Sequence, residues 1–249
     1  MFSSVNSKWR HVSDSMKRRQ VSVIPATGYD RGMSEKTAPA SARVERRDRA
    51  RNRERLIEAA KTVFSSTGLH APLDRIAARA GVGPGTLYRH FPSRAVLWSA
   101  VLADPLRQHL AAVETALADA DPWDGFAGFV LAMCGADARP GGYPDLLNTR
   151  FDDAPDLREL RVRIQRGVTR IFARAHAAGA IRADVTAEDL YFVIASNAAV
   201  ATATRGIAPD AWRRNAALYL DAFRPQAATT LPVAPLSVRE LTEIVAPEP

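Results

Sequence analysis

The segment 76–91 constrains the fold more than any other part of the sequence. Its pattern predicts two short helices joined by a turn. Ala77 is small enough for a close helix crossing, and Gly81 stands where we expect a positive φ. Apolar anchors for the two helices come from Val82, Leu87 and Phe91. This spacing is typical of a helix-turn-helix, whose second helix enters the major groove of duplex DNA.

The net charge of +7 is unevenly distributed along the chain. Residues 1–50 hold 11 basic and 5 acidic residues and carry +6, and residues 51–102 hold 8 and 3 and carry +5. Residues 103–249 hold 15 and 19 and carry −4. A basic N-terminal part and an acidic C-terminal part suit a phosphate-binding module joined to a domain that avoids nucleic acid. The alternative is that the charged residues only keep the surface solvated. This explanation fits the basic N-terminal part poorly, because the helix-turn-helix lies within it.

The rest of the sequence predicts an all-α fold, because alanine is plentiful and neither a strand pattern nor an internal repeat is present. A helix from Val44 should end at Gly68, and a later helix should begin after Ser93 as its N-cap and kink or break at Pro105. Further helices are expected at about 123–136, 143–151, 155–179, 187–205 and 210–223, with a short helical turn at 238–245.

The location of the protein is also constrained. No stretch approaches the roughly 18 apolar residues of a membrane span, and residues 1–20 lack the apolar run of a secretory signal. Cys134 is the only cysteine, which excludes an internal disulfide and fits a reducing compartment; we expect it to be a core residue. These features predict a cytoplasmic protein with no membrane partner.

Residues 83–94, Gly-Pro-Gly-Thr-Leu-Tyr-Arg-His-Phe-Pro-Ser-Arg, together with 76–82 resemble the DNA-reading segment of the tetracycline-repressor (TetR) family, and the similarity is strong from about Arg53 to Leu102. The resemblance implies a helix-turn-helix domain followed by a helical ligand-binding and dimerisation domain. We therefore divide the chain into a disordered basic extension (1–43), a DNA-binding domain (44–92), a ligand-binding and dimerisation domain (93–224) and a loosely ordered tail (225–249).

By the same resemblance, the side chains that face DNA lie on the second helix of the motif. Thr86 and Tyr88 offer hydroxyls to phosphate oxygens, and the fork of Arg89 suits the O6/N7 edge of guanine. One departure from the family pattern is the run Pro72-Leu73-Asp74, where a Thr or Ser often contacts phosphate. The full expected DNA-binding set is Pro84, Gly85, Thr86, Tyr88, Arg89, His90 and, as a backbone contact, Arg94.

The resemblance also implies a homodimer on a near-palindromic double-stranded DNA operator, with an unidentified small-molecule effector. The last two long helices are the expected interface, although their stripes would equally suit an intramolecular core. The interface stripes are Tyr191, Ile194, Ala198 and Ala201 on one helix and Trp212, Ala216, Tyr219 and Phe223 on the other. The expected pocket residues are Trp98, Leu102, Phe126, Phe129, Val130, Met133, Leu147, Phe151, Ile164, Val168 and Phe172.

The resemblance implies a sequence-specific regulator and, as the family default, a homodimeric repressor released from its operator by a small ligand. The scarcity of polar groups on the expected pocket faces suggests that this ligand is largely apolar. The alternatives are a DNA-binding protein without ligand sensing and a transcriptional activator. An enzyme is disfavoured: the glycines at 81–85 are followed by no Lys-Ser/Thr pair, and the chain has no nucleophile elbow. We expect no cofactor and no metal site, because the five histidines lack ligand spacing.

Overall fold

The computed structural model describes residues 40–139, 141–143, 146, 149–226 and 228–245. The chain divides into two units, Met1–Arg46 and Arg47–Pro249. In the first unit the described residues, 40–46, are helical and form the start of α2. All other features below belong to the second unit. Regular structure in the described residues is helical throughout, so the fold is all-α as predicted.

The DNA-binding domain contains the helices α2, α3 and α4, of which α3 and α4 form the helix-turn-helix. Gly68 ends α2 with φ +93°, and Gly81 ends α3 with φ +66°, both as expected for glycine at these turns. At Gly81 a Cβ atom would also come within 2.9 Å of the Arg55 guanidinium. The buried side chains Leu87 and Phe91 hold α4 on its support. The bounds are Ala40–Thr67, Leu73–Ala80 and Pro84–His90.

The C-terminal helices follow from α5 onward. The Ser93 hydroxyl accepts a hydrogen bond from the Val96 N–H at 3.3 Å, so Ser93 is the N-cap of α5 as predicted. The bounds are α5 Arg94–Ala118, α6 Pro122–Ala138, α7 Pro155–Ala177, a 3₁₀ turn η1 Ala187–Asp189, α8 Leu190–Thr204, α9 Ala211–Phe223 and α10 Val238–Val245.

Three sequence expectations need correction. The first helix begins at Ala40, so 40–43 of the predicted disordered extension are helical, whereas 1–39 lie outside the described residues. Pro105 does not break α5, which runs through it. No helix forms at 143–151 among the residues described there; Gly141, three residues beyond the end of α6, adopts φ +84°, which is not helical.

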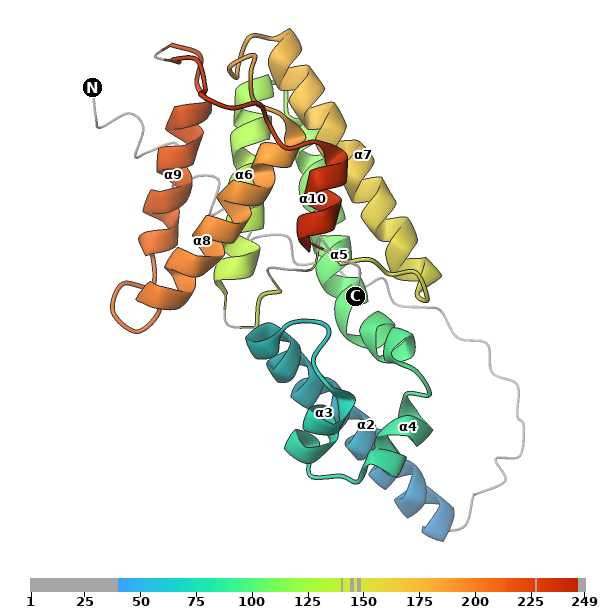
Figure 1. Cartoon of the computed structure of the whole chain (residues 1–249). Coiled ribbons are helices and arrows are strands. Elements are labelled where there is room, and N and C mark those ends of the chain that lie inside the picture. Colours follow the sequence, from blue (N-terminus) through green and yellow to red (C-terminus); the bar gives the residue numbers. More distant parts are fainter. Residues whose placement is uncertain (1–39, 140, 144–145, 147–148, 227, 246–249) are drawn as a thin grey trace, which may run out of the picture. The chain divides into compact units, whose positions relative to one another are not determined.

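The C-terminal helices form one layered bundle. Figure 1 shows α8 and α9 side by side next to α6, and α5 packs against α6 and α7. Arg174 on α7 donates to carbonyls at the end of α5, including that of Ala116, and so fixes this helix end. The fully buried Asn197 of α8 donates to the Cys134 carbonyl at 3.3 Å and accepts from Asn215 of α9 at 3.3 Å.

One contiguous apolar core runs from Leu56 in α2 to Phe223 in α9. Cys134 is fully buried in it, and burial raises the pKa of its thiol to about 12, which agrees with the predicted core role. None of the described helices is both long enough and apolar enough to cross a membrane. The short helix α10 at 238–245 was expected from the sequence and is present.

Candidate nucleic-acid interface and ligand pocket

The helix α4 presents one face to solvent and one to the core. Leu87 is 1% exposed, whereas Tyr88 is 49% exposed and Arg89 is also exposed. The Arg89 Nε donates to the Gly85 carbonyl at 3.2 Å, and this bond does not use the two terminal nitrogens of the guanidinium. Of the other expected contacts, Pro84 and Gly85 are exposed and Thr86 and His90 are half-buried.

Basic residues of α2 lie near the end of α4. The pKa of His90 is lowered, first by burial and then by the charges of Arg49, Arg53 and Arg89. The guanidinium carbon of Arg53 lies 5.3 Å from the centre of the Phe91 ring. His90 is therefore neutral near pH 7, with a ring N–H group available to a phosphate oxygen. Arg49 and Arg53 belong to a basic run in the sequence, residues 46–53.

Arg94 makes contacts different from those expected of a DNA-facing residue. Its Nη1 donates to the carbonyls of Leu69 and Ala71 at 3.1 and 2.7 Å, and burial lowers its pKa. The Trp98 indole N–H also donates to the Leu69 carbonyl, at 3.0 Å. Together these bonds fasten the start of α5 to the loop between α2 and α3. Pro72, at the N-cap of α3, makes no side-chain capping bond, in line with the departure seen in the sequence.

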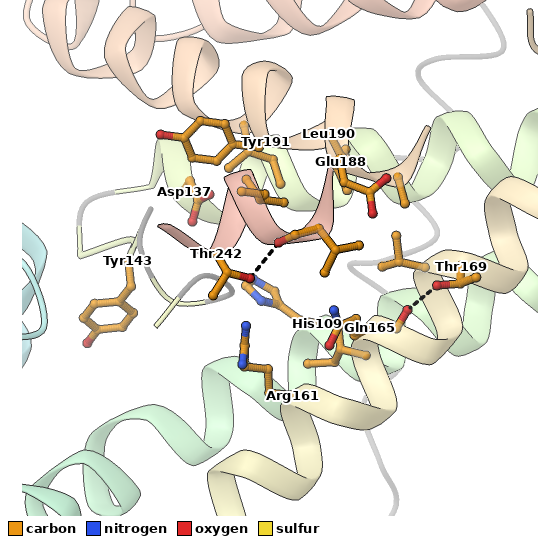
Figure 2. A pocket seen from close by; sticks show the side chains of 16 residues that line it. His109, Asp137, Tyr143, Arg161, Gln165, Thr169, Glu188, Leu190, Tyr191 and Thr242 are labelled. Atoms are coloured by element: carbon orange, nitrogen blue, oxygen red, sulfur yellow. Dashed lines mark hydrogen bonds between the residues drawn. The ribbon is translucent and has the colours of Figure 1, made fainter. Parts of the chain in front are cut away.

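A pocket of about 160 Å³ lies among α5, α7, α8 and α10 (Figure 2). Its apolar wall includes Ile164 and Val168 from α7 and Leu190 and Ile194 from α8. Polar side chains also line it, from α5, α6, α7, η1 and α10: His109, Asp137, Arg161, Gln165, Thr169, Glu188 and Thr242, together with the phenols of Tyr143 and Tyr191.

His109 is the most unusual of these polar groups. Its side chain is 5% exposed, and its Nδ1 has no hydrogen-bond partner among the described residues. Burial lowers the pKa of His109 to about 4, with the charge of Arg139 as the second cause. An unsatisfied buried nitrogen is costly in free energy, so His109 Nδ1 stands out among the polar atoms of the described residues. The sequence signal for it is a histidine within the apolar stripe of α5, which pattern reasoning missed because it treated the stripe as uniformly apolar.

Among the residues expected to line a ligand pocket, Ile164 and Val168 line this one. Leu147 lies outside the described residues. The others fill the core between helices, where aromatic rings meet edge to face: Phe126 contacts Phe172 at 5.1 Å and Phe223 at 5.5 Å between ring centres. These core residues are Trp98, Leu102, Phe126, Phe129, Val130, Met133, Phe151 and Phe172.

Of the eight residues in the two apolar stripes expected at a dimer interface, four are buried in the protomer's own core and four are half-buried. Ile194, Ala201, Ala216 and Phe223 are all buried within the chain. A different face of the same helices remains exposed, with Phe192 on α8 at 46% and Leu218 on α9 at 59%. Ala195, Ala199 and Ala222 are the small exposed residues beside them.

Sequence comparisons place both regions in one family. Residues 56–101 match the model "Bacterial regulatory proteins, tetR family", and residues 121–225 match "Transcriptional regulator SbtR-like, C-terminal domain". A TetR regulator from Streptomyces coelicolor is 32% identical, over 70% of this chain and 99% of that one, with a TM-score of 0.42. A TetR protein from Mycobacterium vanbaalenii is 31% identical, over 72% and 99%, with a TM-score of 0.36. This chain therefore belongs to the TetR family of DNA-binding transcriptional regulators.

Proposed function

We propose that the protein is a homodimeric repressor, released from a near-palindromic operator by a small molecule. The observation that carries this proposal is the arrangement of α4, whose buried Leu87 and Phe91 hold Tyr88 and Arg89 outward on a helix-turn-helix. The acidic C-terminal domain with its pocket supports the effector role. Repression and a cytoplasmic location follow the family pattern and not a particular contact.

The proposed DNA contacts fall into two kinds. Arg89 reads a base edge, whereas Thr86, Tyr88 and His90 bind phosphate together with the backbone near Pro84 and Gly85. His90 does so as a neutral donor, because burial and the neighbouring arginines lower its pKa. Arg94 has a different role, since its bonds to two carbonyls hold the α2–α3 loop against α5.

We propose that a second copy of the chain packs against the exposed apolar face formed by Phe192, Ala195, Ala199, Leu218 and Ala222. Small residues beside large ones allow close helix approach, and α8 and α9 pack against each other. An operator with two-fold symmetry requires two helix-turn-helix units about 34–36 Å apart, which a two-fold dimer supplies.

The proposed route of release runs from the pocket to α2. Tyr143 is buried and borders the pocket; burial raises the pKa of its phenol to about 12, with the Glu58 carboxylate of α2 as a second cause. A ligand that displaces Tyr143 therefore changes the surroundings of a DNA-binding helix. A tenfold loss of operator affinity needs only about 1.4 kcal/mol of differential binding.

The deciding experiment is a fluorescence-anisotropy titration of the full chain against DNA from upstream of its own gene and against a scrambled duplex, at several salt concentrations. We expect saturable binding of two chains to the native duplex only. Equal, steeply salt-dependent binding to both would contradict a regulator of that promoter. Leu218→Glu should abolish dimerisation in sedimentation and operator binding alike, whereas Ile207→Glu, at a loop residue that is 92% exposed, should change neither.

A further inference from the structure

The C-terminal helix α10 lies outside the segment 121–225 that matches the family model, yet it forms part of the pocket wall. Val238, Leu241 and Thr242 line the pocket from this helix (Figure 2). The charged residues Arg239 and Glu243 pair with each other at 2.8 Å and are exposed. The helix is therefore amphipathic, and its less polar face points toward the pocket.

The chain that leads to α10 is fastened to the domain. The Arg182 guanidinium donates to the Asp184 carboxylate at 2.6 and 2.8 Å and to the carbonyl of Thr229. The backbone N–H of Leu231 also donates to Asp184, and these bonds lower the pKa of Asp184 to about 2. The segment near 229–231 is thus a fixed anchor, only a few residues before α10.

The helix α10 itself is well capped but weakly buried. The Glu240 carboxylate accepts from the Ser237 N–H at 2.8 Å, and the Ser237 hydroxyl accepts from the Glu240 N–H at 3.2 Å, which forms a capping box. Of the residues that line the pocket, Leu241 is only half-buried and Val238 is 61% exposed. A preformed helix with a fixed anchor and little buried surface can lift from the pocket at small cost in free energy.

The pocket beneath α10 restricts what can bind there. A dry cavity of about 150 Å³ accommodates benzene, so about 160 Å³ corresponds to a molecule of one ring. Among the described residues, the buried polar atom of this wall without a hydrogen-bond partner is His109 Nδ1. A hydroxyl both donates and accepts and so satisfies this nitrogen in either tautomer. The charges of Asp137 and Glu188 in the wall are balanced by that of Arg161 and by that of Arg139, which also acts on His109. No net positive charge is left to hold a buried anion.

We infer that the pocket takes a neutral, ring-sized compound whose hydroxyl group bonds to His109 Nδ1, and that α10 is the lid that closes over it. This inference rests on the proposed effector role of the pocket. The apolar wall of Ile164, Val168 and Leu241 surrounds the ring, and the hydroxyl reaches the buried polar atom that the described residues leave unsatisfied in this wall. Movement of α10 about its anchor admits the compound and then retains it.

The ligand class is tested with the full chain, without DNA, by calorimetric titration with phenol, benzene and benzoate. Phenol should bind saturably, and about tenfold more tightly than benzene or benzoate, because only phenol satisfies the buried nitrogen without adding negative charge. His109→Leu should remove the preference for phenol over benzene, and His109→Gln, which keeps a hydrogen-bonding group, should retain part of it. Equal binding of phenol and benzene, or no saturable phenol binding at millimolar concentration, would overturn the inference.

The lid is tested with Leu241→Glu and its matched control Ile244→Glu, which makes the same change at a residue of α10 that does not line the pocket. Leu241→Glu should weaken phenol binding about tenfold and Ile244→Glu less than about twofold. Phenol should also slow hydrogen exchange in α10 of the wild-type chain. Unchanged exchange, or equal effects of the two variants, would contradict the lid. Since no DNA is present, this result can fail while operator binding stands.

Discussion

The recognition helix α4 and the wall of the pocket use buried and exposed residues in opposite ways. In α4 the residues proposed to contact DNA are on the outside, and the buried Leu87 and Phe91 only hold the helix in place. In the C-terminal domain the distinctive polar group, His109, is 5% exposed and sits within the same apolar layer that stabilises the fold. Function and stability are therefore separable in the first region and coupled in the second.

The largest expected effect is the pH dependence that His109 gives the C-terminal domain. Its pKa is about 4 in the folded chain against the usual 6.5, so the unfolded chain binds more protons between these values. The free energy of unfolding should therefore fall as pH decreases from 7 to 4, by about 3 kcal/mol from this group alone. Denaturant unfolding at both pH values, at one fixed chain concentration, measures this loss.

His109→Leu is the control for that measurement, because it removes the titrating group and leaves every carboxylate in place. The difference in unfolding free energy between pH 7 and pH 4 should be smaller in the variant by about 3 kcal/mol. An identical pH dependence in both proteins would mean that His109 is not held neutral by burial, and the coupling of site and stability would lose its main support.

A second effect comes from the close crossing of α5 and α7 beside the pocket. A Cβ atom at Gly167 would lie 2.1 Å from Val113 Cγ1, so Gly167→Ala should lower the free energy of unfolding by about 2 kcal/mol. Gly128, in α6, has nothing within 4 Å of the same position. Gly128→Ala should therefore raise that free energy by about 0.5–1 kcal/mol. Thermal unfolding of the two variants should shift in opposite directions; a common direction would refute the close-packing argument.

The sequence predicted these two regions with unequal success for the same physical reason. The turn at Gly81, the cap at Ser93 and the inward Leu87 depend on neighbours a few residues away, and each is as expected. The pocket depends on which faces of distant helices meet. Apolar stripes such as those containing Phe126 on α6 and Phe172 on α7 have the same pattern whether they border a cavity or fill a core. Only packing distinguishes the two.

Within the DNA-binding domain, Arg94 and Arg89 lie on either side of Phe91 and differ in how much each should contribute to stability. Arg94 bonds to the carbonyls of Leu69 and Ala71, so Arg94→Ala leaves two acceptors without their charged donor. Because the side chain is partly exposed, we expect a loss of about 1.5 kcal/mol in the free energy of unfolding. Arg94→Lys should restore less than half of it, because one ammonium lacks the planar fork. Chemical denaturation of both variants measures this difference.

The smallest expected effect on stability belongs to Arg89, although its effect on DNA binding should be clear. The side chain is exposed and its one bond is to the Gly85 carbonyl on the same helix, so Arg89→Ala should change the free energy of unfolding by less than about 0.5 kcal/mol. Operator affinity should fall by about 1–3 kcal/mol, with less discrimination against a changed base pair. Anisotropy titrations with operator and single-base variants measure both quantities. A uniform loss on every duplex would instead make Arg89 a phosphate contact, and α4 would then need another residue to read sequence.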